Sequence, residues 1–204
     1  MKDTKDRILL TALRLFARDG YEAVSVSDIA GELGITKGAL YRHYRNKRDV
    51  FDSILARMEE LDAVRAGEYG LPEGTAEEMP EAYSGASVDR MVDYAKSQFR
   101  YWTEDDFAAS FRRLLTLEQY RNREMGKLCQ QYLISGPVGY MADLFAAAGL
   151  PRPMEEAVGF YAPMFFLYGV HDGAEDRAAV LSLLDCLMEN ARARLKKLMN
   201  EVKS

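Results

Sequence analysis

The chain has 204 residues, of which 48% are hydrophobic and 29% are charged, and its formal net charge is −5. This usage is ordinary for a globular protein and argues against disordered, collagen-like and disulfide-built chains. The two cysteines, Cys129 and Cys186, stand far apart without a CxxC pair, which argues against a zinc cluster. The longest apolar run, residues 160–170, is too short to span a bilayer, and the amino terminus lacks a signal-peptide pattern. We therefore expect a cytoplasmic protein whose thiols are reduced.

The charge is distributed unevenly along the chain. Residues 1–50 contain ten Lys and Arg against seven Asp and Glu, whereas the remainder contains seventeen against twenty-five. Within the first part, residues 36–48 (TKGALYRHYRNKR) carry five Lys and Arg side chains and no acid. Such a run is usually a solvated face, so its position in the fold decides whether it binds an acidic partner.

Apolar residues recur at helical spacing and show no sustained alternation, which predicts an all-α fold. The first predicted helix covers about residues 3–19 and ends at Gly20, because glycine tolerates the left-handed conformation that closes many helices. Its apolar side consists of Ile8, Leu9, Ala12, Leu13 and Phe16.

Two short helices separated by a tight turn follow. Ser25 and Asp28 have the spacing of a capping box, which predicts a helix that begins at Ser25 and ends at Gly34. Thr36 caps the next short helix and Asn46 caps a fourth. This is a helix-turn-helix pattern, and the second member of such a pair can lie in the major groove of DNA. The pattern alone is weak, but the acid-free cationic run falls on that second helix and strengthens it.

The middle of the chain is predicted to be a loop followed by further helices. Residues 66–85 are rich in Gly, Pro, Glu and Ser, which predicts a loop. Thr103 and Asp106 again have capping-box spacing, so a helix should begin at Thr103. We expect helices over residues 88–102, 103–120 and 122–148, the last one broken near residues 135–137.

The last two predicted helices suit a partner chain. The helix over residues 154–170 is apolar on nearly all sides after Gly159, with a kink expected at Pro163 and a turn at residues 171–173. The final helix repeats apolar residues at steps of three and four, which is typical of packing between helices. The predicted dimer interface consists of Tyr161, Val180, Leu184, Leu187, Ala191 and Leu195.

Three segments of the N-terminal region carry a family resemblance: ALRLFARDGY (residues 12–21), SVSDIA (25–30) and GITKGALYRHYRNK (34–47). Together they resemble the DNA-binding domain of TetR-type (tetracycline-repressor-like) transcriptional regulators. The resemblance implies an N-terminal three-helix helix-turn-helix DNA-binding domain over residues 1–47. It also implies a C-terminal helical ligand-binding and dimerisation domain over residues 48–204, which matches the family in architecture only.

The resemblance also implies which residues meet double-stranded DNA. The recognition helix would open toward base edges, Lys47 would contact a phosphate, and Ser25 would cap the preceding helix beside the DNA backbone. Without the resemblance, the rings of Tyr41 and Tyr44 are as readily explained by packing between helices as by DNA contact, and His43 is an exposed polar residue. The implied DNA-contact residues are Ser25, Thr36, Lys37, Gly38, Ala39, Tyr41, His43 and Lys47.

For the rest of the chain, the resemblance implies a homodimer that reads a palindromic operator. A small molecule in the C-terminal core would release the operator, and repression is expected rather than activation. An aromatic-rich set at helical spacing suits a hydrophobic or aromatic effector, and the same residues can simply pack a core. The candidate ligand-binding residues are Phe99, Trp102, Phe107, Phe111, Tyr132, Phe165, Tyr168 and His171.

No motif in the sequence demands catalysis. A Gly-rich phosphate loop, GxSxG, HExxH and a Cys/His pair are all missing, so we expect no enzyme, no cofactor and no metal site. Two other functions stay open at this point. One is a helical small-molecule carrier or enzyme in which the N-terminal motif only packs, and the other is a DNA-binding protein without sequence preference.

Overall fold

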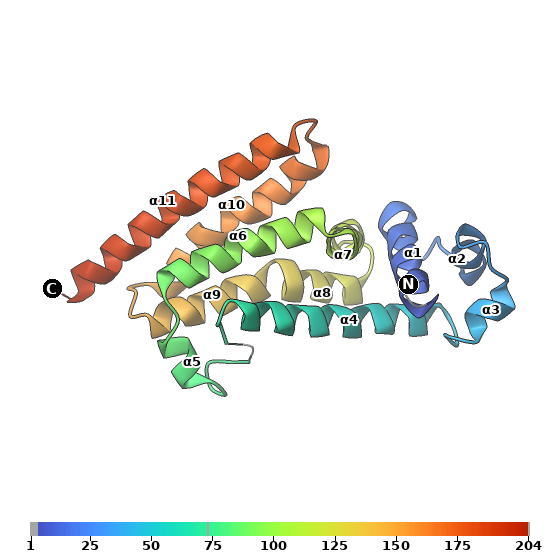
Figure 1. Cartoon of the computed structure of the whole chain (residues 1–204), viewed down its shortest axis with the longest axis horizontal. Helices are drawn as coiled ribbons and strands as arrows, with labels where there is room; N and C mark the ends of the chain where they lie inside the picture. The colour runs from blue at the N-terminus through green and yellow to red at the C-terminus, as the bar shows by residue number, and fades with distance from the viewer. Residues whose placement is uncertain (1–3, 73, 204) are drawn as a thin grey trace. The chain divides into compact units, whose positions relative to one another are not determined.

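The computed structural model describes residues 4–72 and 74–203, and the regular secondary structure of these residues is helical throughout (Figure 1). The predicted all-α fold is therefore confirmed. The helices are α1 (Thr4–Asp19), α2 (Val26–Glu32), α3 (Lys37–Tyr41), α4 (Lys47–Glu68), α5 (Pro80–Ser84), α6 (Val88–Glu104), α7 (Asp106–Glu118), α8 (Arg123–Leu133), α9 (Ser135–Ala147), α10 (Pro153–Gly173) and α11 (Arg177–Lys203).

The first helices are bounded by the residues that the sequence indicates. Helix α1 is followed by Gly20, whose φ of +92° is left-handed. At the start of α2 the Ser25 hydroxyl accepts the Asp28 N–H at 3.2 Å, and the Asp28 carboxylate accepts the Ser25 N–H at 2.7 Å. At the start of α3 the Thr36 hydroxyl accepts the Ala39 N–H at 3.1 Å. Both predicted caps are thus formed, which fixes the direction of each short helix.

The predicted cap at Thr103 is wrong. Thr103 lies inside α6, and its hydroxyl donates to the Phe99 carbonyl at 2.7 Å. The cap of α7 is Asp105, whose carboxylate accepts the N–H groups of Phe107 and Ala108 at 3.0 and 2.9 Å. Several neighbouring polar residues could cap α7. Because α6 extends to Glu104, Asp105 is the one that lies outside both helices and can do so.

Two other predicted boundaries also differ from the structure. The predicted loop contains the short helix α5, with Pro80 in its first turn, where a missing N–H costs nothing. Helix α10 continues through residues 171–173, which were predicted to form a turn. The break predicted near residues 135–137 is present between α8 and α9, and Pro137 lies in the first turn of α9.

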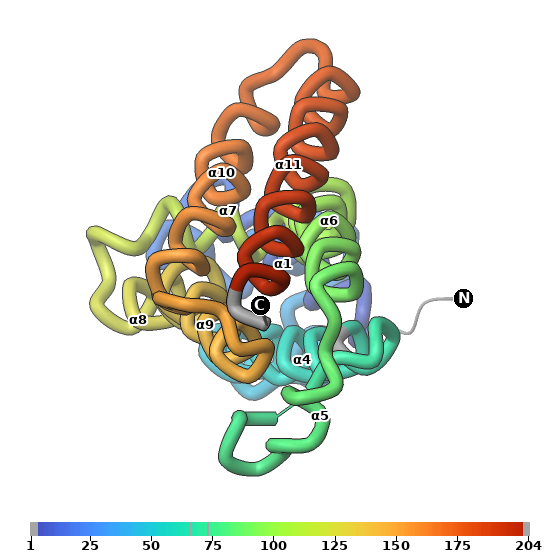
Figure 2. The backbone as a smooth tube through the Cα atoms, turned by 90° about the vertical axis from the view of Figure 1, so that its left-hand side faces the viewer, coloured from blue at the N-terminus to red at the C-terminus, as the bar shows by residue number. Residues whose placement is uncertain are grey.

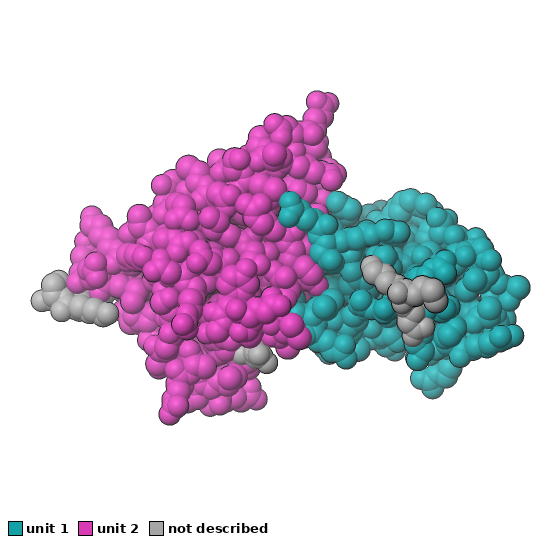
Figure 3. All heavy atoms as spheres, viewed as in Figure 1, with its two compact units in different colours: residues 1–62, 104–129 teal, residues 63–103, 130–204 magenta. Residues whose placement is uncertain are grey.

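The chain packs as two compact units, coloured separately in Figure 3. Unit 1 comprises residues 1–62 and 104–129, and unit 2 comprises residues 63–103 and 130–204. This grouping differs from a division at residue 47, because α7 packs along α1 and joins the helix-turn-helix region. The large, fully buried side chains of unit 1 include Ile8, Leu13, Phe16, Ile29, Leu40, Phe51, Ile54 and Phe111.

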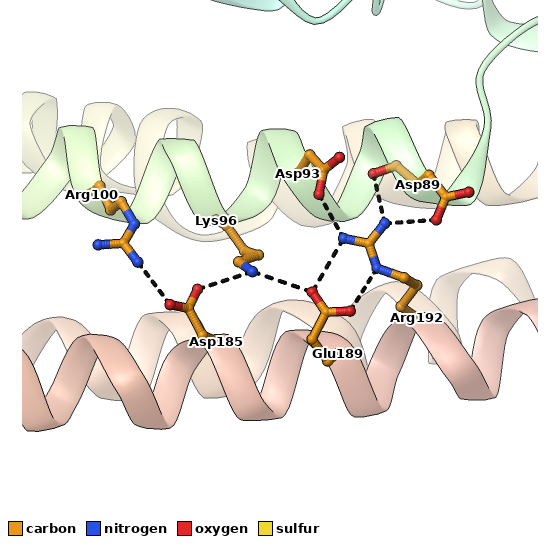
Figure 4. A network of polar contacts seen from close by, with 7 residues as sticks. All are labelled: Asp89, Asp93, Lys96, Arg100, Asp185, Glu189 and Arg192. Carbon is orange, nitrogen blue, oxygen red and sulfur yellow. Dashed lines mark hydrogen bonds and ion pairs between the residues drawn. The ribbon is translucent and has the colours of Figure 1, made fainter.

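In unit 2, charged side chains link α6 to α11 (Figure 4). The Arg192 guanidinium contacts Asp89 at 2.7 Å, Asp93 at 2.6 Å and Glu189 at 2.9 Å. Lys96 lies 3.1 Å from Asp185 and 3.2 Å from Glu189, and Arg100 lies 2.8 Å from Asp185. These ion pairs share partners, so they form one continuous network along the two helices.

Helices α10 and α11 lie side by side in Figures 1 and 2. Much of the predicted dimer stripe packs inside the protomer, and its role in a dimer stays a prediction. Leu184 and Leu195 are fully buried, Val180 and Tyr161 are nearly so, and Leu187 and Ala191 are half-buried. Helical periodicity shows which residues share a face, but not which of two apolar faces turns inward. The exposed apolar side chains of these helices are Met154, Val158, Phe165, Phe166, Val170 and Leu183.

Candidate nucleic-acid interface

The turn between α2 and α3 brings the two helices together. Gly34 has a φ of +65°, which few residues other than glycine adopt easily, and the N–H of Ile35 donates to the Ala30 carbonyl at 3.0 Å. From α3 and the residues after it, Leu40 and Tyr44 are buried and hold the helix against unit 1. The opposite side of α3 therefore faces solvent.

The solvent side of α3 carries the residues predicted to meet DNA. Thr36, Lys37 and Gly38 are exposed, and Tyr41 is 45% exposed. The Lys37 ammonium lies 5.8 Å from the centre of the Tyr41 ring, so the cation and the aromatic ring form one surface. Ala39 and His43 are half-buried at the edges of this surface.

Gly38 leaves open space on the exposed side of α3. A Cβ atom built there would meet only the Thr36 hydroxyl oxygen within 4 Å, at 3.9 Å, which is an ordinary contact. Packing within the described chain therefore does not require glycine at this position. A residue without a side chain does allow the backbone of a groove-bound helix to approach DNA closely.

Lys47 is held by the connection between α1 and α2. Its ammonium donates to the Tyr21 carbonyl at 2.8 Å and the Glu22 carbonyl at 3.4 Å, and it lies 4.4 Å from the centre of the Tyr21 ring. The side chain is 23% exposed. The Glu22 carboxylate also lies 3.8 Å from this ammonium, so a DNA phosphate would compete with Glu22 for it.

A carboxylate of the protein itself, that of Asp49, lies at the start of α4. The Asp49 carboxylate accepts the Arg45 N–H at 2.8 Å, and the Asn46 side chain accepts the Asp49 N–H at 2.9 Å. The hydrogen bonds from the backbone and side chain of Arg45 lower the pKa of Asp49. The N–H groups of Arg45 and Asp49, on either side of Lys47, are therefore not free to bind a phosphate.

Sequence reasoning missed two acidic residues that attach α7 and α8 to this region. Glu118 is 4% exposed, and its carboxylate accepts the Tyr21 N–H at 3.1 Å. Glu124 accepts two hydrogen bonds of 2.7 Å from the Arg48 guanidinium, which lower the pKa of Glu124. Both contacts join residues more than 70 positions apart, so no local spacing signals them.

Most of the predicted ligand-binding residues lie in unit 2. In unit 2 the rings of Phe99 and Tyr168 stack with centroids 5.0 Å apart, and buried His171 meets Phe99 edge-on at 6.2 Å. Trp102 and Tyr132 pair separately at 6.5 Å. Of the other three residues, Phe107 and Phe111 are buried and belong to unit 1, and Phe165 is 44% exposed on α10.

Phe165 lies on the outer side of α10, and its role in ligand binding stays a prediction. Met164 and Leu167 of the same helix are buried, and Phe165 follows Met164 by about 100° around the axis, which turns its ring to solvent. Phe165 therefore belongs to the exposed apolar side chains of α10. Within residues 4–72 and 74–203, no three His, Cys, Asp or Glu side chains are placed to hold a metal ion. No helix in this part of the chain is long and apolar enough to cross a membrane.

Comparison with known proteins assigns the N-terminal region to a family. Residues 8–54 match the model of bacterial regulatory proteins of the tetR family. The uncharacterised HTH-type transcriptional regulator YerO of Bacillus subtilis (strain 168) is 47% identical over 47 residues, which cover 23% of this chain and 16% of YerO. The HTH-type transcriptional regulator AcrR of Shigella flexneri is 42% identical over 53 residues, which cover 26% of this chain and 25% of AcrR. This chain thus aligns with a quarter or less of the length of these relatives.

The likeness in fold extends over most of the chain. The crystal structure of a transcriptional regulator from Rhodococcus sp. Rha1 superposes with a TM-score of 0.64 over 93% of this chain and 96% of that one. The two sequences are 16% identical, so this likeness concerns the fold alone. Residues 8–54 thus match the tetR family of bacterial regulatory proteins, and the chain as a whole shares its fold with that solved transcriptional regulator.

Proposed function

We propose that this chain is a DNA-binding transcriptional regulator that reads an operator with α3. One observation carries the proposal. A helix fixed by caps at its own start and at the start of α2 presents an exposed first turn without acidic residues. In this proposal the residues from Thr36 to Ala39 approach base edges, and Ser25, Tyr41, His43 and Lys47 contact phosphates or neighbouring bases.

The proposed regulator acts as a homodimer. Six large apolar side chains on α10 and α11 are 37 to 70% exposed, and an exposed apolar patch of this kind marks an interaction surface. A homodimer would present two copies of α3 to one duplex. Their half-sites would lie about 34–36 Å apart, or a multiple of that distance, on a palindromic operator.

The proposed effector is a small hydrophobic or aromatic molecule. The ring stack of Phe99 and Tyr168 beside His171 supports this chemistry, because such groups suit an apolar ligand. We place DNA reading in residues 1–47 and effector binding and dimerisation in residues 48–204. An effector that prefers the non-binding conformation by a few kcal/mol is sufficient to release the operator. We propose repression, because a bound dimer blocks a promoter without any contact to the polymerase.

A mobility-shift assay tests the proposal. The purified protein is titrated into DNA from upstream of its own gene and into a scrambled fragment of the same length. We expect the upstream fragment to bind at least about 10³-fold more tightly, and replacement of Lys37 and Tyr41 by alanine to remove that preference. Lys197→Ala is the matched control, because this exposed lysine lies on α11 in unit 2.

The other outcomes of this assay favour the competing functions. If a folded dimer retards neither fragment, the chain is a small-molecule carrier or an enzyme that uses the N-terminal motif for packing. If it retards both fragments equally, it binds DNA without reading sequence. Either result contradicts the proposed regulator.

A further inference from the structure

The connection between α7 and α8 presents an exposed aromatic ring among cations. Tyr120 is 90% exposed, and Arg121, Arg123 and Lys127 are exposed beside it. Residues 119–129 contain these three cations and one acid, Glu124, although residues 51–204 as a whole are strongly acidic. Residues 119–129, called the basic segment below, are therefore positively charged within an otherwise acidic part of the chain.

The acid of this segment is already paired. Glu124 accepts two hydrogen bonds from Arg48, whereas Arg121, Arg123 and Lys127 form no ion pair with other residues of the described chain. Helix α8 turns its cations outward for a simple geometric reason. Met125 and Cys129 are buried, and Arg123 and Lys127 each lie two positions from Met125, on the opposite side of the helix.

The segment is fixed to the elements predicted to meet DNA. At one end Glu118 holds the backbone of Tyr21, and that residue's carbonyl is held by Lys47. At the other end Glu124 holds Arg48, the second residue of α4. Two backbone hydrogen bonds of 2.9 Å, from Arg121 and Asn122 to the Glu118 carbonyl, hold the connection itself. All these residues belong to unit 1.

We propose that Tyr120, Arg121, Arg123 and Lys127 form a second DNA contact that binds phosphate oxygens of the duplex read by α3. The contact ignores base sequence, because cations and a phenol that meet the backbone carry no base information. It adds affinity through the release of counterions. The inference rests on the proposed DNA binding. It assigns DNA contact to the α7–α8 connection and α8, whereas sequence patterns predict DNA contact for the N-terminal region alone.

The test compares variants of the full-length dimer by fluorescence anisotropy. The probes are a random-sequence duplex and the fragment from upstream of the gene, each titrated at about 50 to 200 mM KCl. Arg121→Ala with Arg123→Ala should flatten the plot of log affinity against log salt by about two units per protomer, equally on both probes. The Tyr120→Phe variant should weaken binding to both probes by the same factor.

Two control variants make the result specific. Arg121→Lys with Arg123→Lys keeps both charges and should keep the wild-type slope. Arg177→Ala with Lys197→Ala makes the same change in net charge on α11 of unit 2, and it should also keep the slope. Circular dichroism checks that each variant is folded.

The possible results separate this inference from the proposed function. If the wild type binds DNA and the double alanine variant keeps the wild-type slope, the basic segment is not a DNA contact, and the regulator proposal stands. If the Arg177→Ala with Lys197→Ala variant flattens the salt dependence by the same amount, net charge explains the effect and the inference is wrong. If the wild type binds neither probe at any salt concentration, DNA binding itself fails and this inference falls with it.

Discussion

The carboxylate of Glu118 accepts the backbone N–H of Tyr21 at 3.1 Å although 97 positions separate the two residues. A Cβ atom at neighbouring Gly20 would lie 2.7 Å from the same carboxylate, and the φ of Gly20 is +92°. The residues that follow α1 therefore pack closely against Glu118 at the end of α7. This contact places the connection that leads into α2 and the DNA-reading pair of helices.

Loss of the Glu118 carboxylate should destabilise unit 1. Glu118→Ala leaves the partly buried Tyr21 N–H without its acceptor, which costs about 1 kcal/mol, the lower end of the cost of an unpaired buried donor. Glu118→Gln keeps an acceptor oxygen and should lose less. Urea denaturation followed by circular dichroism measures both variants. Equal stability of Glu118→Ala and wild type would show that the contact contributes nothing to folding.

Lys47 should affect both folding and DNA binding. Its ammonium bonds the Tyr21 carbonyl at 2.8 Å, so Lys47→Ala should lower the free energy of unfolding by about 0.5–1.5 kcal/mol. We expect a DNA phosphate to replace the Glu22 carboxylate beside this ammonium, so the same variant should flatten the salt dependence of DNA binding by about one unit per protomer. Thermal unfolding and anisotropy titrations check the two effects separately. An unchanged salt slope would remove Lys47 from the DNA interface and leave it a role in positioning only.

The exposed side of α10 should carry the dimer. Phe166 is 70% exposed and Val158 is 49% exposed, so an aspartate at either position should give a folded monomer that no longer binds the operator. Leu184→Asp is the contrasting variant, because this fully buried side chain should unfold the protomer when it is replaced by a charge. Light scattering and circular dichroism distinguish the two results. A stable dimer of Phe166→Asp would refute the proposed interface.

The network between α6 and α11 should make stability depend on acid pH. Hydrogen bonds from Lys196 and Arg192 lower the pKa of Asp89, and those from Arg192 and Lys96 lower the pKa of Glu189. A carboxyl whose pKa is lower in the folded state stabilises the fold above its ordinary pKa, and this contribution is lost as the pH falls through the folded-state value. Stability should therefore decline as the pH drops below the ordinary values of 4.5 for Glu and 3.8 for Asp.

The variant that tests this pH dependence is Arg192→Gln. Without the guanidinium, the pKa values of both carboxyls should return toward normal, so less stability remains to be lost in acid. Melting temperatures of wild type and variant are compared from about pH 7 to pH 3. The difference between them should shrink toward acid. Parallel curves would mean that the network does not couple to protonation.

The helix-turn-helix region could be predicted because its signals are local. Ser25, Asp28 and Thr36 act on backbone groups three positions away, so sequence spacing alone indicates their hydrogen bonds. Gly20 and Gly34 end their helices for an equally local reason, since both adopt a positive φ. The starts and ends of these helices therefore follow from neighbouring residues.

The remaining features depend on contacts between distant residues. The cap at Asp105 depends on where α6 ends, and the role of Glu118 depends on α7 packing along α1. The inward turn of Leu184 is another case, because periodicity gave α11 an apolar stripe without saying whether the protomer or a partner covers it. These relationships could be seen only once the helices were packed.

Nuclease footprinting on DNA from upstream of the gene tests the central claim most directly. Our account predicts protection of one sequence in two symmetric halves, with centres about 34–36 Å apart or a multiple of that distance. The protection should disappear in the variant that lacks Lys37 and Tyr41. Uniform protection of every fragment, or none from a folded dimer, would contradict a regulator that reads its operator with α3.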